Sequence, residues 1–225
     1  MNSCVRDACR PAGRGPFRSV GAHGCYRSHL GVLRAALTAG HDRILVVEDD
    51  CNLADAFAEL ATPVLDALAA RDWSHGRLGQ YAVPGDGREP GVQRIEPGAC
   101  PATTHLCAWR GGAIREVADF LDLLLTREPG AAGHGPQPVD GAFGAFFAGR
   151  PDLRAFYAVP TLAVQRSSRS DIAPPKWFDA VPALRGLVGV ARSLRNRKQS
   201  ERGYNPTPET TGWVAGAGPA IDHPG

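Results

Sequence analysis

Three consecutive carboxylates, Glu48, Asp49 and Asp50, directly follow the aliphatic run at residues 44–47. An unbroken run of branched aliphatic residues is typical of a strand that is buried on both faces of a parallel sheet. The acids would then lie at the carboxyl end of that strand, where open α/β sheets bind their ligands. Two like charges about 4 Å apart repel each other by roughly 1 to 4 kcal/mol, so a cation among the acids would be stabilising. Because carboxylate oxygens suit Mg²⁺ or Mn²⁺, these residues are candidate metal ligands.

Two other interpretations of the acidic run are open. In the first, only one carboxylate points inward, and the others are solvated or cap the helix that follows. In the second, RILVVEDDCNLADAFAEL at residues 43–60 is the first strand and helix of a response-regulator receiver domain, whose paired acids hold Mg²⁺ beside a phosphorylated Asp. A receiver also needs a later strand that ends in Asp, followed by a Lys. The later stretch GVQRIEPGACP holds no Asp and the first lysine is Lys176, so this interpretation is disfavoured.

Periodicity predicts the elements that would position the acids. Tyr26, Leu30, Leu33 and Leu37 recur at helical spacing before the acidic strand, and Gly40 stands where a C-terminal cap glycine belongs. A second helical pattern covers residues 53–71, with an interruption expected at 62–63, where Thr precedes Pro. Strands are expected near residues 78 and 92, at 103–109 and within 153–165, and helices at 114–125 and in VDGAFGAFF, entered through Asp140. This mixture of helices and strands predicts an α/β fold.

Composition limits the class of protein. The chain has 225 residues, 43% of them hydrophobic, which is enough for one main domain. The formal net charge of +2 gives no case for a nucleic-acid partner. No apolar stretch reads as a secretory signal or a membrane span, so a cytoplasmic location is expected. Six cysteines at irregular separations, without a C-x-x-C pair, argue against a zinc site and do not require disulfides.

The expected organisation has four parts. Residues 1–20 lack periodicity and are expected to be poorly ordered, and residues 21–180 form the α/β domain. Residues 181–199 are expected to form a helix whose apolar face is bordered by arginines. Such a basic amphipathic helix can lie on an anionic membrane surface, although more often such a helix packs on its own domain with the basic face in solvent. Residues 200–225 are expected to be a disordered tail.

Four separated stretches of the chain match, in order, the motifs of one known protein family. They are GCYRSHLGVLRAALTAGHDRILVVEDD (24–50), TTHLCAWRGGAIREVADFL (103–121), PVDGAF (138–143) and LAVQRSSRSDI (162–172). Together they resemble glycosyltransferase family 25 over about residues 21 to 172. The resemblance implies a GT-A fold, a Rossmann-like mixed sheet flanked by helices that binds a nucleotide-sugar. Members of the family transfer a sugar, often galactose, from a UDP-sugar in lipopolysaccharide or lipooligosaccharide biosynthesis, and collagen galactosyltransferases are related to them.

The resemblance implies roles for the acids. Glu48 and Asp50 match the outer positions of the family's D-x-D element, which with Asp49 would hold Mn²⁺ or Mg²⁺ on the donor diphosphate. That ion assists the departure of the nucleoside diphosphate. Asp140 is the expected base for the acceptor hydroxyl in an inverting displacement, and a helix N-cap is its alternative role.

Five further residues are expected to bind substrate. Ser28 and His29 lie on the helix beside the acidic strand and are expected to border the nucleotide, and His105 ends another strand. A hydrogen-bonded structural histidine is the alternative for both His29 and His105. Gln165 and Arg166 follow the last apolar strand, where an arginine can pair with phosphate through its fork of donors.

The sequence departs from the family pattern in two places. A GT-A domain opens with a strand of the x-I-N-L kind, and no such pattern precedes Gly21, while DWSHGRLGQYAV at residues 72–83 is charged and glycine-rich where the family has an apolar strand. The expected function is metal-assisted transfer of a hexose such as galactose from a UDP-sugar to a surface-glycan or glycolipid acceptor, with peripheral contact at the inner membrane face. The alternative is a truncated or degenerate member that binds nucleotide-sugar without turnover.

Overall fold

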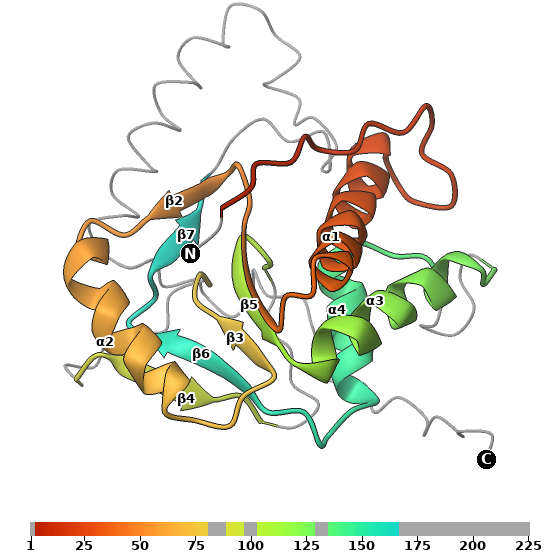
Figure 1. Ribbon diagram of the computed structural model, residues 1–225. Helices are drawn as coiled ribbons and strands as arrows, with labels where there is room; N and C mark the ends of the chain where they lie inside the picture. Colours follow the sequence, from red (N-terminus) through yellow and green to blue (C-terminus); the bar gives the residue numbers. More distant parts are fainter. Residues whose placement is uncertain (1–2, 81–88, 97–102, 129–134, 167–225) are drawn as a thin grey trace, which may run out of the picture.

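A computed structural model describes residues 3–80, 89–96, 103–128 and 135–166 of the chain (Figure 1). The elements follow one another in the order α1 (Val20–Thr38), β1 (Arg43–Val47), β2 (Cys51–Leu53), α2 (Phe57–Ala69), β3 (His75–Arg77), β4 (Gly91–Arg94), β5 (Leu106–Arg110), α3 (Gly112–Leu125), α4 (Val139–Ala148), β6 (Ala155–Val159) and β7 (Ala163–Gln165). The basic helix expected at 181–199 and the tail expected at 200–225 lie outside the described residues. None of the helices described here is both long and apolar enough to cross a membrane.

Five strands form the central sheet in the order β1-β5-β3-β6-β4. β3 and β6 run parallel, and the other neighbouring pairs are antiparallel. α1, α3 and α4 gather on one side of the sheet, and α2 lies on the other side against β4 and β6 (Figure 1). β2 and β7 form a separate antiparallel pair. The predicted α/β fold, with a mixed Rossmann-like sheet flanked by helices, is therefore confirmed.

Two apolar cores hold the helices on the sheet. The larger one includes Trp109 of β5, which is fully buried and stacks on Phe147 of α4 with ring centroids 5.8 Å apart. Tyr26 of α1 belongs to the same core, and its hydroxyl donates to the carbonyl of Leu121 in α3 at 2.7 Å. The smaller core packs Val64 and Leu68 of α2 against residues of β5 and β6. The central strands are thus held from both faces.

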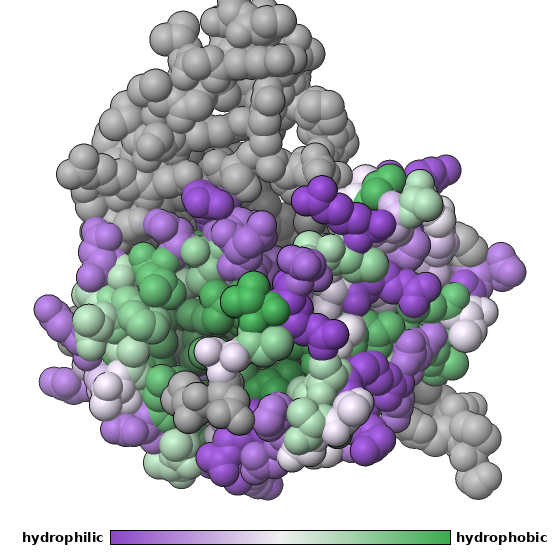
Figure 2. All heavy atoms as spheres, turned by 45° about the horizontal axis from the view of Figure 1, so that its top comes forward, coloured by the Kyte–Doolittle hydropathy of each residue, from purple (hydrophilic) through white to green (hydrophobic). Residues whose placement is uncertain are grey.

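β1 lies at the edge of the sheet, and the prediction of a strand buried on both faces of a parallel sheet is wrong. It pairs antiparallel with β5. Ile44 and Val46 pack against the larger core, while Leu45 and Val47 are 53% and 57% exposed. The aliphatic run is long enough to specify a strand, but it does not show which helices cover that strand. α2 packs on β4 and β6 and leaves the outer face of β1 exposed. Figure 2 shows hydrophobic residues gathered over the left and centre of the molecule, where Figure 1 has α2 and the sheet.

The helix predicted before the acidic strand is confirmed as α1, and local signals fix both of its ends. The side chain of Ser19 accepts a hydrogen bond from the backbone N–H of Ala22 at 3.0 Å, as an N-cap does. Gly40 has φ +70°, and the N–H of Gly40 and of His41 donate to the carbonyls of Leu37 and Ala36, which is a Schellman ending. Residues 3–19 form no helix or strand.

α2 runs through Pro63 without interruption, so the break predicted at 62–63 is wrong. Proline removes one hydrogen bond there, and the packing of Val64 and Leu68 on the sheet keeps the helix continuous. The short helix α4 begins at Val139, with Pro138 as its N-cap residue, so Asp140 is the second helical residue.

Residues 75–77 of the charged stretch that departs from the family pattern form a buried strand, β3. The ring of His75 lies against Trp109 with centroids 4.1 Å apart, and the Arg77 guanidinium donates to the carbonyl of Thr103. Burial, with the nearby charge of Arg77, lowers the pKa of His75, so the ring is neutral at pH 7. The predicted strand near residue 78 is therefore present although its side chains are polar.

Candidate functional site

Glu48 is fixed at the end of β1 by contacts from two other elements. Its N–H donates to the carbonyl of His105 at 2.9 Å, which continues the pairing of β1 with the β5 segment. Its carboxylate Oε1 accepts from His29 Nε2 at 3.1 Å and from the hydroxyl of Thr104. Burial raises the pKa of Glu48, but the hydrogen bonds and charge of His29 and the Thr104 hydroxyl outweigh it, so the net pKa lies below the usual value. The carboxylate is therefore ionised at neutral pH.

Asp50 turns toward a different neighbour. Its Oδ2 accepts from Gln165 Nε2 at 2.8 Å, whereas its Oδ1 is buried without a hydrogen-bond partner among the described residues. Burial, helped by the charges of Glu48 and Asp49, raises the pKa of Asp50 against the opposing effect of Gln165. A buried carboxylate oxygen without a partner is costly, and a bound cation would satisfy it.

The pairing of β2 with β7 brings the Q-R segment to the acids. Cys51 lies opposite Gln165 in this pair. The N–H of Arg166 donates to the carbonyl of Asp50 at 2.8 Å, and its guanidinium donates to the carbonyl of Asp49 at 3.3 Å. Both predicted substrate-binding residues of this segment therefore lie beside the acidic run.

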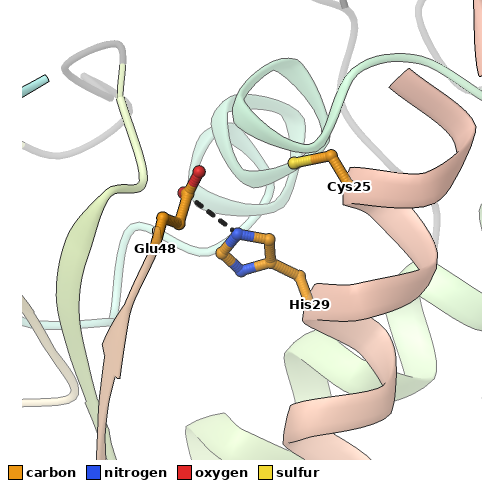
Figure 3. A group of neighbouring side chains, drawn as sticks. All are labelled: Cys25, His29 and Glu48. Carbon is orange, nitrogen blue, oxygen red and sulfur yellow. Dashed lines mark hydrogen bonds and ion pairs between the residues drawn. The ribbon is translucent and has the colours of Figure 1, made fainter. Parts of the chain in front are cut away.

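The carboxylates of Glu48, Asp49 and Asp50 do not converge on one point. Among the described residues, the one group of three or more potential ligands whose atoms all lie within 4.8 Å of one another is Cys25, His29 and Glu48. Figure 3 shows Cys25 and His29 on α1, facing the Glu48 side chain. The site thus has two parts. Around Glu48, the potential metal ligands are a sulfur, a nitrogen and an oxygen atom. Around Asp50, the potential metal ligands are carboxylate oxygens.

Cys25 was not among the predicted site residues. Its thiol is half-buried, and burial first, then the charges of Glu48, Asp140, Asp50 and Asp49, raise its pKa far above the usual value. The thiol is therefore protonated in the metal-free protein. All the charges that act on it are negative, so the cluster lies in a negative potential.

Asp140 is exposed in the first turn of α4. Its Oδ1 accepts a hydrogen bond from the N–H of Gly141 at 2.9 Å. Pro138 takes the cap position, so Asp140 does not cap the helix as the alternative interpretation proposed. Its charge acts on Cys25, which indicates that the start of α4 faces the same region as the start of α1.

His105 and Ser28 have structural partners. His105 is buried, its Nε2 donates to the carbonyl of Ala163 at 3.3 Å, and its Nδ1 has no partner within the described part of the chain. Burial lowers the pKa of His105, so the ring is neutral. The Ser28 hydroxyl donates to the carbonyl of Gly24 at 2.8 Å and accepts from the N–H of Cys9 at 2.8 Å. Ser28 therefore fastens the N-terminal segment to α1.

Two residues of the site were missed by sequence reasoning, although both lie inside the motifs that carried the resemblance. Cys25 precedes His29 by four residues, one helical turn, so both fall on one face of the helix. Thr104 precedes His105 and donates to Glu48. Comparison of the chain with protein-family models and with curated proteins finds no match in either.

Proposed function

We propose that this chain is a metal-dependent glycosyltransferase of the family 25 type. It transfers a hexose such as galactose from a UDP-sugar to a surface-glycan or glycolipid acceptor. The observation that carries the proposal is the meeting of separate motifs at one place: His29 and Thr104 contact Glu48, and Gln165 contacts Asp50. A shared structural core alone would not require polar residues from three distant segments to converge on the end of one strand.

Asp50 is the residue best suited to hold the donor metal. Its unpartnered Oδ1 gives it a free ligand atom, and the exposed Asp49 lies next to it. Oxygen ligands fit Mn²⁺ or Mg²⁺, and the bound ion would neutralise charge that develops on the departing UDP. Glu48 is assigned away from this ion, because its carboxylate is turned toward His29 and Thr104, whereas the Asp50 carboxylate is turned toward Gln165.

The neighbouring residues support the donor site. Gln165 fixes the orientation of the Asp50 carboxylate through its 2.8 Å hydrogen bond. The side chain of Arg166 uses one guanidinium nitrogen on Asp49, and its other N–H groups are directed to the diphosphate in this proposal. Asp140, exposed at the start of α4, is the proposed base for the acceptor hydroxyl. His29 borders the nucleotide, while Ser28 and His105 support the site through their backbone contacts.

The acceptor and the location follow the same proposal. A glycolipid acceptor fits a protein at the inner face of a membrane, with the basic residues 181–199 as the contact. The remainder of the chain is proposed to lie in the cytoplasm. No nucleic-acid partner is proposed, because the net charge is close to neutral.

The second candidate is a degenerate member that binds nucleotide-sugar without turnover. The exposure of Leu45 and Val47 favours it, because a strand with one bare apolar face is less firmly held than a buried one. A receiver-like module is less suited to the structure, because the sheet has mainly antiparallel neighbours and receivers have the parallel, doubly wound kind.

Release of UDP separates the two candidates. The purified chain is incubated with Mn²⁺ and a panel of UDP-hexoses, with and without a lipooligosaccharide acceptor, and free UDP is measured. The transferase proposal predicts acceptor-stimulated release that Asp50→Asn lowers by about 100-fold or more, as for loss of a principal charge-stabilising group. Asp66→Asn, an exposed acid of α2, is the matched control and retains activity. UDP binding without release by any donor would favour the degenerate member.

A further inference from the structure

We propose that Cys25, His29 and Glu48 form a binding site for a thiophilic divalent ion, best suited to Zn²⁺, and that this site is distinct from the donor-metal region at Asp50. The inference does not depend on the glycosyltransferase proposal. Zinc binds through thiolate sulfur, imidazole nitrogen and carboxylate oxygen, and the cluster supplies one atom of each kind (Figure 3).

The geometry is close to that of a tetrahedral site. The three potential ligand atoms all lie within 4.8 Å of one another, and His29 Nε2 and Glu48 Oε1 are 3.1 Å apart. Ligand atoms on a tetrahedral zinc ion, at bond lengths of about 2.0 to 2.3 Å, lie roughly 3.4 to 3.6 Å apart. The Cys25 sulfur therefore has to move toward the other two atoms by at most about 1.4 Å, which rotation of the Cys25 side chain can supply.

The elements that carry the ligands are already fixed. Cys25 and His29 are one turn apart on α1, so the helix sets their separation. The His29 ring meets the Phe143 ring edge-on, with centroids 5.7 Å apart, and is only 5% exposed. Glu48 is fastened through its N–H to β5 and through its carboxylate to Thr104. Little of the binding free energy is therefore lost in ordering the ligands.

Charge and exposure both favour an ion with an open coordination position. Glu48, Asp140, Asp50 and Asp49 all act on the Cys25 thiol, so a dication at the cluster meets a negative potential. The side chain of Glu48 is 19% exposed and Cys25 is half-buried, which leaves one side of the cluster accessible. Three protein ligands with a fourth position open to water is the arrangement of reactive zinc sites, whereas structural sites are closed.

Binding requires two proton movements. The Cys25 thiol loses its proton to solvent as the sulfur–zinc bond forms, so the ligand is a thiolate. The ring proton of His29 moves from Nε2 to Nδ1 by exchange with solvent, because the Nε2 lone pair must face the ion. The hydrogen bond from His29 to Glu48 is replaced by bonds from both residues to zinc. No oxidant or reductant takes part.

Cobalt titration tests the site, because Co²⁺ takes the same ligands and a thiolate ligand gives a charge-transfer band in the near ultraviolet. The wild-type chain is expected to bind Co²⁺ with this band, and Zn²⁺ is expected to displace it. Cys25→Ser is expected to lose the band, and Zn²⁺ affinity measured by competition with a chelating dye is expected to fall by more than the roughly 10- to 100-fold that loss of an outer-shell partner costs. His29→Ala is expected to lower the affinity similarly.

The matched control is Cys51→Ser. Cys51 is also half-buried and also lies near Asp50 and Glu48, yet it is outside the cluster. It is expected to keep the band and the affinity. A band that survives in Cys25→Ser, or that Cys51→Ser abolishes, would overturn the inference, as would the absence of the band from the wild-type chain. Circular dichroism of each variant verifies folding, and Cys25→Ala is the second variant if Cys25→Ser does not fold.

The same set of variants separates this inference from the proposed function. Asp50→Asn is expected to keep the cobalt band while it loses metal-dependent UDP binding. If the band is absent and UDP binding with Mn²⁺ is intact, the zinc site is wrong and the donor-metal site at Asp50 stands. If the band is present and UDP does not bind, the proposed function is wrong and the zinc site stands.

Discussion

Replacement of Gly79 by alanine tests whether His105, which directly precedes β5, is packed as tightly as the structure indicates. A Cβ on Gly79 would lie 2.5 Å from His105 Nε2 and 2.9 Å from the Cβ of Leu106. Both distances are shorter than real Cβ contacts, and His105 is buried, so its ring has no solvent to move into. The substitution must therefore displace His105 or the backbone beside it.

Two costs follow from that displacement. Overpacking a core typically costs about 1 to 3 kcal/mol. Loss of the hydrogen bond from His105 Nε2 to the carbonyl of Ala163 adds about 1 kcal/mol. Gly79→Ala is thus expected to lower the free energy of unfolding by about 2 to 4 kcal/mol, which corresponds to a fall of about 4 to 16 °C in melting temperature for a domain of this size.

The assay is urea unfolding followed by circular dichroism, with a thermal melt beside it. Gly31→Ala is the matched control, because the added Cβ meets nothing within 4 Å on α1. Alanine in a helix interior is favoured over glycine, so this variant is expected to gain about 0.5 to 1 kcal/mol. A melting temperature for Gly79→Ala that equals the wild-type value, or exceeds that of Gly31→Ala, would refute the close packing of His105.

Three smaller changes probe the site and α1. The folded-state pKa of Glu48 lies below its usual value of 4.5, so its ionised form adds stability that is fully present above that pH and is lost as pH falls through the folded pKa. Glu48→Gln is therefore expected to be less stable than the wild type at pH 7, with a difference that shrinks in acid during pH-dependent urea unfolding. Thr104→Val removes a donor to this carboxylate, and a loss of about 1.5 to 3 kcal/mol is expected in the same experiment at pH 7, whereas an unchanged midpoint would contradict the contact. Ser19→Ala removes the N-cap of α1 and is expected to cost about 1 kcal/mol in thermal melts, and Ser19→Gly to cost only a few tenths.

The helices were predictable because their signals are local. The apolar spacing of α1 and the glycine that ends it lie within the helix and its cap, and the same is true of the apolar stripe of α3. The position of β1 in the sheet was not predictable, because its partner β5 lies far along the chain and antiparallel pairing leaves no mark on five aliphatic residues. The break predicted at Pro63 was wrong for a related reason. Burial of the α2 side chains against the sheet outweighs the local preference of proline for a helix end.

The position of the acidic residues after a strand was predictable from the sequence, but the directions of their side chains were not. The acids do follow a strand, as the aliphatic run indicated. The directions of their side chains depend on partners from other elements, which turn Glu48 to His29 and Asp50 to Gln165. Cys25 was missed because zinc spacing rules compare cysteines with one another, while its partners are a histidine on the same helix and a glutamate from β1.

Calorimetric titration of UDP into the chain, with and without Mn²⁺, tests the donor-metal site at Asp50 most directly. The wild-type chain is expected to bind UDP at least about tenfold more tightly with Mn²⁺, which is about 1.4 kcal/mol, and Asp50→Asn is expected to lose that gain. Asp66→Asn is expected to keep it. UDP affinity that does not respond to Mn²⁺, or a metal-dependent gain that persists in Asp50→Asn, would contradict the assignment of Asp50 as the residue that holds the donor metal.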